Sequence, residues 1–132
     1  MKGNSFEWTP KIHVAAKGET KNFDIVFVAS DGRISIRQIA KAEIKYKNMA
    51  PKILNATNFV SGRVNEPVLM SVKAIDEDND DLTYTWKFGL FESYKAASSM
   101  QRIFTSRGPK IVKVIVSDGI DSVEQLINVN VI

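Results

Sequence analysis

Large apolar residues alternate with polar ones from Leu82 to Phe88. The apolar set occupies every second position and consists of Leu82, Tyr84, Trp86 and Phe88. A period of two residues is typical of a β-strand that buries one face. We therefore predict a strand here, and we expect Trp86 to lie in a core between two sheets rather than to form an exposed platform for stacking sugars.

The first third of the chain shows the same alternation on both sides of a turn. Residues 23–29 predict a strand, Ser30-Asp31-Gly32 has the composition of a tight turn, and residues 34–46 keep their apolar residues on one parity. Residues 39–44 also contain good helix formers. Because the parity holds throughout residues 34–46, we predict a second strand and hence a hairpin with one apolar face.

The segment Asn48-Met49-Ala50-Pro51 interrupts this pattern, and its proline is unsuited to a central strand. We place a domain boundary here, with one domain at residues 1–48 and another at residues 49–132. The predicted elements of the second domain are strands around residues 53–56, 68–74, 112–116 and 123–131, two short strands between 89 and 107, and turns at Ser61-Gly62 and Ser117-Asp118-Gly119.

The two Ser-Asp-Gly turns lie 87 residues apart. At this offset Ser35 coincides with Ser122, Gln38 coincides with Gln125, and the inward apolar positions of the two hairpins also coincide. The period indicates an internal repeat of about the size of one immunoglobulin domain. The alignment predicts that residues 1–48 are the carboxyl-terminal half of one repeat and that residues 49–132 are a complete repeat.

Composition limits the classes of function. The 132 residues are 44% apolar, which suffices for one sizeable core, and the absence of cysteine excludes disulfides and thiolate metal sites. The net charge of +3 comes from the first 48 residues, where nine Lys and Arg face five Asp and Glu. These cations are not interleaved with aromatic residues, and no apolar run reaches about 18 residues. We expect no nucleic-acid binding, no direct membrane insertion and no signal peptide.

Catalytic residues are not recognisable in the sequence. The one histidine, His13, has no acidic residue or cysteine at ligand spacing, and Ser98 and Ser99 lack the context of a nucleophile elbow. There is no glycine-rich phosphate loop. We therefore predict that the protein is not an enzyme and requires no cofactor.

An acidic turn precedes the strand that contains Trp86. Five carboxylates fall within six residues, at Asp76, Glu77, Asp78, Asp80 and Asp81. Oxygen ligands at this density suit Ca²⁺, although Asp81 and Lys87 stand where an EF-hand loop requires glycine and glutamate. Two hypotheses remain open: a weak calcium site formed by Asp76, Asp78 and Asp80, and a solvated turn without an ion.

Two stretches of the chain resemble known repeats. The sequence FEWTP, followed by NFDIVFVASDG and NMAPKI, resembles the second half of the cadherin-like, immunoglobulin-like repeats of large prokaryotic surface and secreted proteins. The sequence AIDEDNDDLTYTWKFG, with IFTSRGPKIVKVIVSDG downstream, is similar to the polycystic-kidney-disease (PKD) type of the same sandwich. The resemblance covers nearly the whole chain and rests on turn and core residues.

The resemblance implies an all-β fold: one complete immunoglobulin-like β-sandwich preceded by a partial one. It implies a non-catalytic structural or adhesive module of a larger cell-surface or secreted protein, in which other immunoglobulin-like repeats are its neighbours. In cadherin-type repeats an Asp-x-Asp turn binds calcium together with acidic residues of the linker. Here the linker carries Lys45, Lys47 and Asn48 instead.

Two other functions remain open at this stage. An accessory module of a secreted hydrolase would bind polysaccharide or protein, and an exposed aromatic row formed by Phe91, Tyr94 and Phe104 would favour it. A self-assembling subunit of a surface filament would be completed by strands from a neighbouring chain. The hairpin predicted at residues 23–46 bears on self-assembly, because a lone two-stranded hairpin is marginally stable in water. Upstream strands, the second domain or another chain could cover its apolar face.

Overall fold

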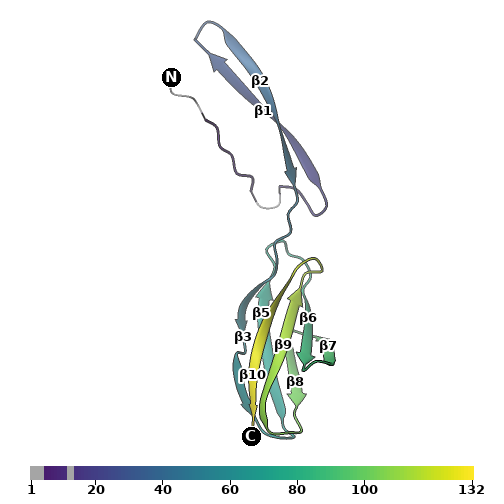
Figure 1. Ribbon diagram of the computed structural model, residues 1–132. Coiled ribbons are helices and arrows are strands. Elements are labelled where there is room, and N and C mark those ends of the chain that lie inside the picture. The colour runs from purple at the N-terminus through teal and green to yellow at the C-terminus, as the bar shows by residue number, and fades with distance from the viewer. Residues whose placement is uncertain (1–4, 12–13) are drawn as a thin grey trace. The chain divides into compact units, whose positions relative to one another are not determined.

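The computed structural model describes residues 5–11 and 14–132. It contains ten β-strands and divides into two compact units, Met1–Lys47 and Asn48–Ile132. His13, to which the sequence assigned no role, lies outside the described residues. The described part of the first unit has one sheet and the second unit has two (Figure 1).

The first unit contains one antiparallel hairpin. β1 (Thr20–Ser30) pairs with β2 (Ser35–Lys45) along its whole length, which confirms the strand and excludes the helix considered for residues 39–44. The segment before the hairpin lies against one face of it, because the Phe6 ring packs edge-on against Phe27 and the Trp8 ring packs edge-on against Phe23. Most of the hairpin nevertheless remains exposed.

The second unit is a sandwich of two sheets (Figure 1). The smaller sheet has the order β3-β5-β8 and the larger has the order β4-β10-β9-β6-β7. The eight strands are β3 (Lys52–Ala56), β4 (Phe59–Gly62), β5 (Pro67–Ile75), β6 (Thr83–Phe88), β7 (Glu92–Ala96), β8 (Ser99–Ile103), β9 (Gly108–Ser117) and β10 (Ser122–Val131). Connections that cross repeatedly between two sheets, antiparallel except for the β4–β10 pair, make this an immunoglobulin-like sandwich, as the sequence predicts.

The core lies between the inner faces of the two sheets. Trp86 is fully buried, which confirms its predicted place, and its indole Nε1 donates a hydrogen bond to the carbonyl of Ala97 at 3.0 Å. The other buried members alternate along their strands: Val68, Met70, Val72, Phe88, Val112, Val114, Val116, Ile127, Val129 and Val131. The alternation that identified these strands in the sequence is therefore the alternation of buried and exposed side chains.

The predicted turn at Ser61-Gly62 is wrong. Both residues belong to β4, which pairs in parallel with the end of β10 through Ser61–Asn130 and Gly62–Val131. Gly62 is required here by packing rather than by a turn, since a Cβ at this position would lie 2.3 Å from Cγ2 of Val68. A glycine inside a strand can mark such a close approach.

The internal repeat is visible in the geometry of the two units. The register of β1 and β2 coincides with that of β9 and β10 at the offset of 87 residues, so that Ser30–Ser35 corresponds to Ser117–Ser122. Each turn has a glycine with a positive φ, +89° and +93°. The first unit therefore contains the counterpart of one hairpin of the sandwich.

Candidate functional site

The acidic turn between β5 and β6 is organised by Asp76. Its Oδ1 accepts hydrogen bonds from the backbone N–H groups of Asp78 at 2.8 Å and Asp80 at 3.2 Å. Asn79 has a φ of +59°, which closes the turn. The other oxygen, Asp76 Oδ2, is buried and has no hydrogen-bond partner in the structure. The carboxylate therefore has a clear local role in shaping the loop.

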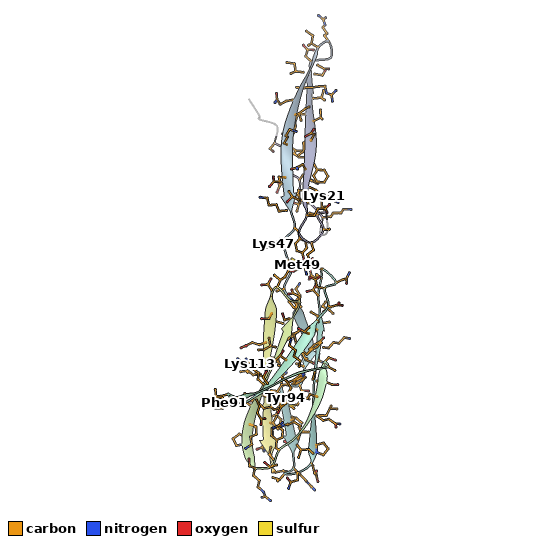
Figure 2. The ribbon with its side chains drawn as sticks, turned by 90° about the vertical axis from the view of Figure 1, so that its right-hand side faces the viewer. Lys21, Lys47, Met49, Phe91, Tyr94 and Lys113 are labelled. Carbon is orange, nitrogen blue, oxygen red and sulfur yellow. The ribbon has the colours of Figure 1, made fainter. Side chains whose placement is uncertain are left out.

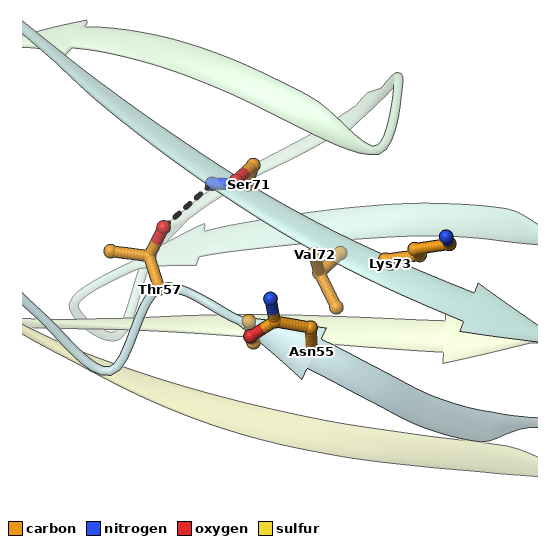
Figure 3. A pocket seen from close by; sticks show the side chains of 6 residues that line it. Asn55, Thr57, Ser71, Val72 and Lys73 are labelled. Atoms are coloured by element: carbon orange, nitrogen blue, oxygen red, sulfur yellow. Dashed lines mark hydrogen bonds between the residues drawn. The ribbon is translucent and has the colours of Figure 1, made fainter.

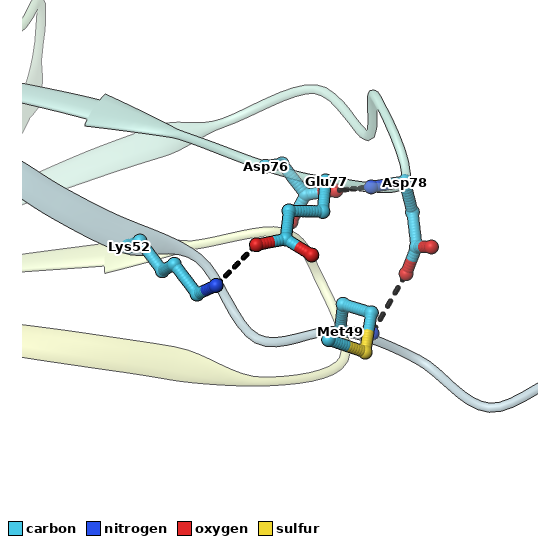
Figure 4. A network of polar contacts seen from close by, with 5 residues as sticks. All are labelled: Met49, Lys52, Asp76, Glu77 and Asp78. Carbon is cyan, nitrogen blue, oxygen red and sulfur yellow. Dashed lines mark hydrogen bonds and ion pairs between the residues drawn. The ribbon is translucent and has the colours of Figure 1, made fainter. Parts of the chain in front are cut away.

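The same turn holds the beginning of the sandwich. Asp78 Oδ2 accepts a hydrogen bond of 2.7 Å from the backbone N–H of Met49, and Glu77 forms an ion pair with Lys52 at the start of β3 (Figure 4). These contacts join the β5–β6 turn to the segment that leads into the smaller sheet. The lysine side chain is more than half exposed, so solvent screens its ion pair and the charged hydrogen bond at Met49 matters more.

A second turn binds the same segment through Asn48. The Nδ2 group of Asn48 donates to Asp118 Oδ2 at 2.9 Å and to Asp121 Oδ2 at 2.8 Å. Asp118 is only 7% exposed, and its Oδ1 also accepts from the backbone N–H groups of Ile120 and Asp121. The side-chain amide of Asn48 thus bridges two carboxylates that would otherwise repel each other.

We call these residues the amino-terminal cluster of the sandwich: Asn48, Met49, Lys52, Asp76, Glu77, Asp78, Asp118 and Asp121. Asp31 provides an internal comparison, because its Oδ1 accepts from the N–H groups of Arg33 and Ile34 in the same way as Asp118 accepts in its turn. These backbone hydrogen bonds, of which the one from Ile34 has the largest effect, lower the pKa of Asp31 below its ordinary value. The β9–β10 turn thus keeps the hydrogen-bonding pattern of its counterpart in the first unit, and in the sandwich it also binds the segment that precedes β3.

The structure assigns the predicted calcium residues to different tasks. Asp76 shapes its own turn and Asp78 binds Met49, while the backbone N–H of Asp80 bonds to Asp76. Across residues 5–11 and 14–132, no three acidic or histidine side chains form a group that could hold a metal ion. The binding roles of Asn48 and Asp118 were missed from the sequence. The offset of 87 residues marks Asp118 as a turn residue, but nothing in the sequence indicates that Asn48 reaches it.

The aromatic residues between β6 and β9 do not form one exposed row. Phe91 is 96% exposed at the β6–β7 turn (Figure 2), and Tyr94 is 42% exposed. Phe104 packs against the core, where its ring lies 6.4 Å from that of Phe88. The guanidinium of Arg102 lies 4.8 Å from the centre of the Phe88 ring. Phe104 and Arg102 thus pack against Phe88, and they do not form a flat exposed surface together with Phe91.

A small hollow lies where the chain leaves the smaller sheet (Figure 3). It measures about 260 Å³ and is lined by Asn55, Ala56, Thr57, Ser71, Val72 and Lys73. The N–H of Ser71 donates to Thr57 Oγ1 at 3.1 Å, and the N–H of Thr57 donates to the carbonyl of Ser71 at 2.9 Å. These bonds satisfy the backbone at the end of β3, so the hollow is explained by the crossing of the chain between sheets.

Comparison with known proteins gives similarity of fold only. No family model matches the sequence, and no curated protein matches it. Similar solved structures include a quinonprotein alcohol dehydrogenase-like protein from Bacteroides thetaiotaomicron, with 13% identity, a TM-score of 0.49, and coverage of 62% of this chain and 20% of that one. The tandem Ig repeats of Dlar, a Drosophila receptor protein tyrosine phosphatase, have 17% identity, a TM-score of 0.47, and coverage of 86% and 81%.

A third similar structure is an endo-fucoidan hydrolase of glycoside hydrolase family 107, with 18% identity, a TM-score of 0.46, and coverage of 93% of this chain and 20% of that one. This chain thus spans about a fifth of the dehydrogenase-like protein and of the hydrolase. In the part of the chain that the structure describes, no helix has the length and apolar character needed to traverse a bilayer. The second unit is thus an immunoglobulin-like sandwich, and hydrogen bonds from its own turns bind its first residues.

Proposed function

We propose that this chain is a non-catalytic structural or adhesive module of a larger cell-surface or secreted protein, acting as a spacer or protein-interaction domain between neighbouring immunoglobulin-like repeats. One observation carries the proposal. Asn48 binds the β9–β10 turn, whereas Ile132 follows Val131, which pairs with Gly108 at the opposite end of the same two strands. The chain therefore comes into the sandwich at one end and leaves at the other, as a module in a linear series requires.

The strand order suits a load along this direction. β4 lies parallel to β10 from Phe59–Asn128 to Gly62–Val131. When the two ends of the sandwich are pulled apart, β4 is drawn towards the Asn48 end and β10 towards the Ile132 end. The hydrogen bonds between them are then loaded together in shear rather than broken one at a time. The sandwich should resist such a force as one cooperative unit.

Single-molecule pulling tests the spacer role. The chain has no cysteine, so Lys47→Cys and Ile132→Cys provide unique attachment points on either side of the sandwich. We expect one cooperative rupture at a well-defined force. In the matched control, Lys47→Cys and Ser122→Cys place both attachments at the same end, so β10 is peeled and the rupture force falls. Gradual extension without a rupture peak in the first geometry would contradict a load-bearing spacer.

The finer assignments rest on the resemblance of turn and core sequences. The PKD and cadherin-like relationship and the extracellular or cell-surface location are part of this proposal. The accessory-module alternative loses its specific support because Phe91, Tyr94 and Phe104 do not lie in one exposed row. Binding of a polysaccharide in a glycan screen, lost on Phe91→Ala, would restore it.

The calcium site at Asp76, Asp78 and Asp80 stays a prediction. Its structural support is the buried Asp76 Oδ2, which has no hydrogen-bond partner among the described residues. If a cation binds there weakly, millimolar Ca²⁺ should raise the thermal unfolding midpoint of the sandwich, since a ligand that binds only the folded state stabilises it. Asp76→Asn should abolish the rise, and Asp24→Asn in β1 serves as the control. An unchanged midpoint would leave the turn with its hydrogen-bonding role alone.

A further inference from the structure

The hairpin of the first unit has two long edges that the described part of the chain leaves unpaired. In the sandwich the corresponding strands are paired on both sides, β9 by β6 and β10 by β4. Apolar residues are also exposed on the hairpin, among them Ile36 at 70% and Ile39 at 52%. A two-stranded sheet is marginal in water, and unpaired apolar edges favour the addition of strands.

We propose that a second copy of this chain pairs with the hairpin through β2, antiparallel to it and related by a two-fold axis at Ala40. The result is a four-stranded sheet in the order β1-β2-β2-β1. This inference goes beyond the proposed function of the sandwich, because it concerns the first unit only. It is carried by the hydrogen-bonding parity of β2 and by the order of its charges.

The backbone fixes which residues face the outer edge. The N–H of Asp31 donates to the carbonyl of Ile34, and the N–H of Tyr46 donates to that of Glu19, so the even-numbered positions of the β2 segment bond inward to β1. The outward N–H and C=O groups therefore belong to the odd-numbered residues, from Ser35 to Lys45. In a symmetric antiparallel pair, the odd-numbered residues of one copy must therefore lie opposite odd-numbered residues of the other. The allowed registers consequently differ from one another in steps of two residues.

Charge decides among these registers. With Ala40 opposite Ala40, all eleven residues of β2 are paired, and Arg37 stands opposite Glu43 twice. Moving the axis to Ile39 places Arg37 opposite Lys41, and moving it to Lys41 places Arg37 opposite Lys45 and Lys41 opposite itself. Opposite charges directly across an antiparallel pair are stabilising and like charges are destabilising. Of these three registers, only the full-length one pairs opposite charges. An axis at Ala42 would place Lys41 opposite Glu43 but would pair only seven of the eleven residues of β2.

The remaining contacts agree with this register. Ile36 stands opposite Ile44 of the second copy on the other face, which extends the apolar surface across four strands. Glu43 already forms an ion pair of 2.9 Å with Lys45, and the hydrogen bond between them raises the pKa of that lysine. Arg37 takes part in none of the ion pairs formed among the described residues. Each Glu43 would therefore lie between two cations in the dimer.

The charges along β1 do not favour any symmetric register of a β1–β1 contact. In its full-length symmetric register Asp24 faces the apolar Val26, and one step away Asp24 faces itself. Neither arrangement pairs opposite charges. We therefore assign the contact to β2, and the cross-linking experiment below compares the two edges directly.

Cross-linking tests the axis. Because Ala40 bonds inward, Ala40 opposite Ala40 is a non-hydrogen-bonded pair, in which side chains are closest. The natural chain has no cysteine, so Ala40→Cys should form a covalent dimer under mild oxidation. Ile25→Cys, at the centre of β1, should react far more slowly. Faster dimerisation of Ile25→Cys, or none of Ala40→Cys, would overturn the assignment.

Charge reversal tests the register in the full chain. By sedimentation equilibrium we expect a reversible dimer, and Arg37→Glu or Glu43→Arg alone should weaken it about tenfold, because each change alters two symmetric pairs. The double variant Arg37→Glu/Glu43→Arg should recover the wild-type dissociation constant, which a merely misfolded hairpin would not. Arg107→Glu, an equal charge change in the sandwich, should have no effect. A monomer at all concentrations, or single and double variants of equal affinity, would overturn the proposal.

Discussion

Replacing Trp86 with alanine is expected to lower the free energy of unfolding of the sandwich by about 3–5 kcal/mol. The indole is fully buried, stands opposite Val114 on one neighbouring strand and Tyr94 on the other, and donates to the carbonyl of Ala97. Its removal leaves a large cavity between the sheets and an unpaired carbonyl. Such a loss is comparable to the whole stability of a small domain.

Urea denaturation followed by far-ultraviolet circular dichroism measures this change. Trp86→Phe should fall between the wild type and the alanine variant, because it keeps most of the apolar volume and loses the hydrogen bond to Ala97. Leu69→Ala, at a 57% exposed position of β5, should change the free energy by no more than about 0.5 kcal/mol. An alanine variant at position 86 that unfolds at the wild-type urea concentration would show that Trp86 is not the centre of the core.

Replacing Asp118 with alanine is expected to cost about 2–4 kcal/mol, the second largest effect. The carboxylate accepts hydrogen bonds from Ile120, Asp121 and Asn48, and it is almost buried. Its loss leaves several polar groups without their partner and releases one contact that holds the beginning of the sandwich. Chemical denaturation gives the size, and amide hydrogen exchange of the β9–β10 turn should rise in the variant.

Two variants separate the roles of Asp118. Asn48→Ala removes only the bonds to the preceding segment and should cost less than Asp118→Ala, because the turn itself remains. Asp31→Ala removes the equivalent turn bonds in the exposed first hairpin, so the unfolding of the sandwich should not change. If Asn48→Ala and Asp118→Ala are both neutral, the amino-terminal cluster does not stabilise the sandwich.

Much of the fold can be read from alternation. The positions of Tyr84, Trp86 and Phe88 predict a strand with one buried face, and the structure buries Trp86 fully. The two hairpins and their common offset also follow from sequence, because a Ser-Asp-Gly turn has strict backbone requirements that few residues meet. Local geometry and burial period leave a direct trace in the order of residues.

Contacts between distant segments leave no such trace. The sequence of Ser61-Gly62 is typical of a turn, yet pairing with β10 and the approach of Val68 make it a strand. The five carboxylates from Asp76 to Asp81 suggest an ion, and nothing in their sequence indicates that Asp78 binds the backbone N–H of Met49. In both cases the deciding partner lies elsewhere in the chain.

Side-chain period and turn chemistry act over a few residues, and they therefore predict an all-β chain with a core around Trp86 and a repeated hairpin. Three further features can be seen in the folded protein alone: β4 runs parallel to β10, Asn48 binds Asp118 and Asp121, and β2 presents its odd-numbered backbone groups to an open edge. These features depend on which strands become neighbours. Strand pairing depends on the packing of the whole core, and no local sequence pattern specifies which strand will be the partner of another.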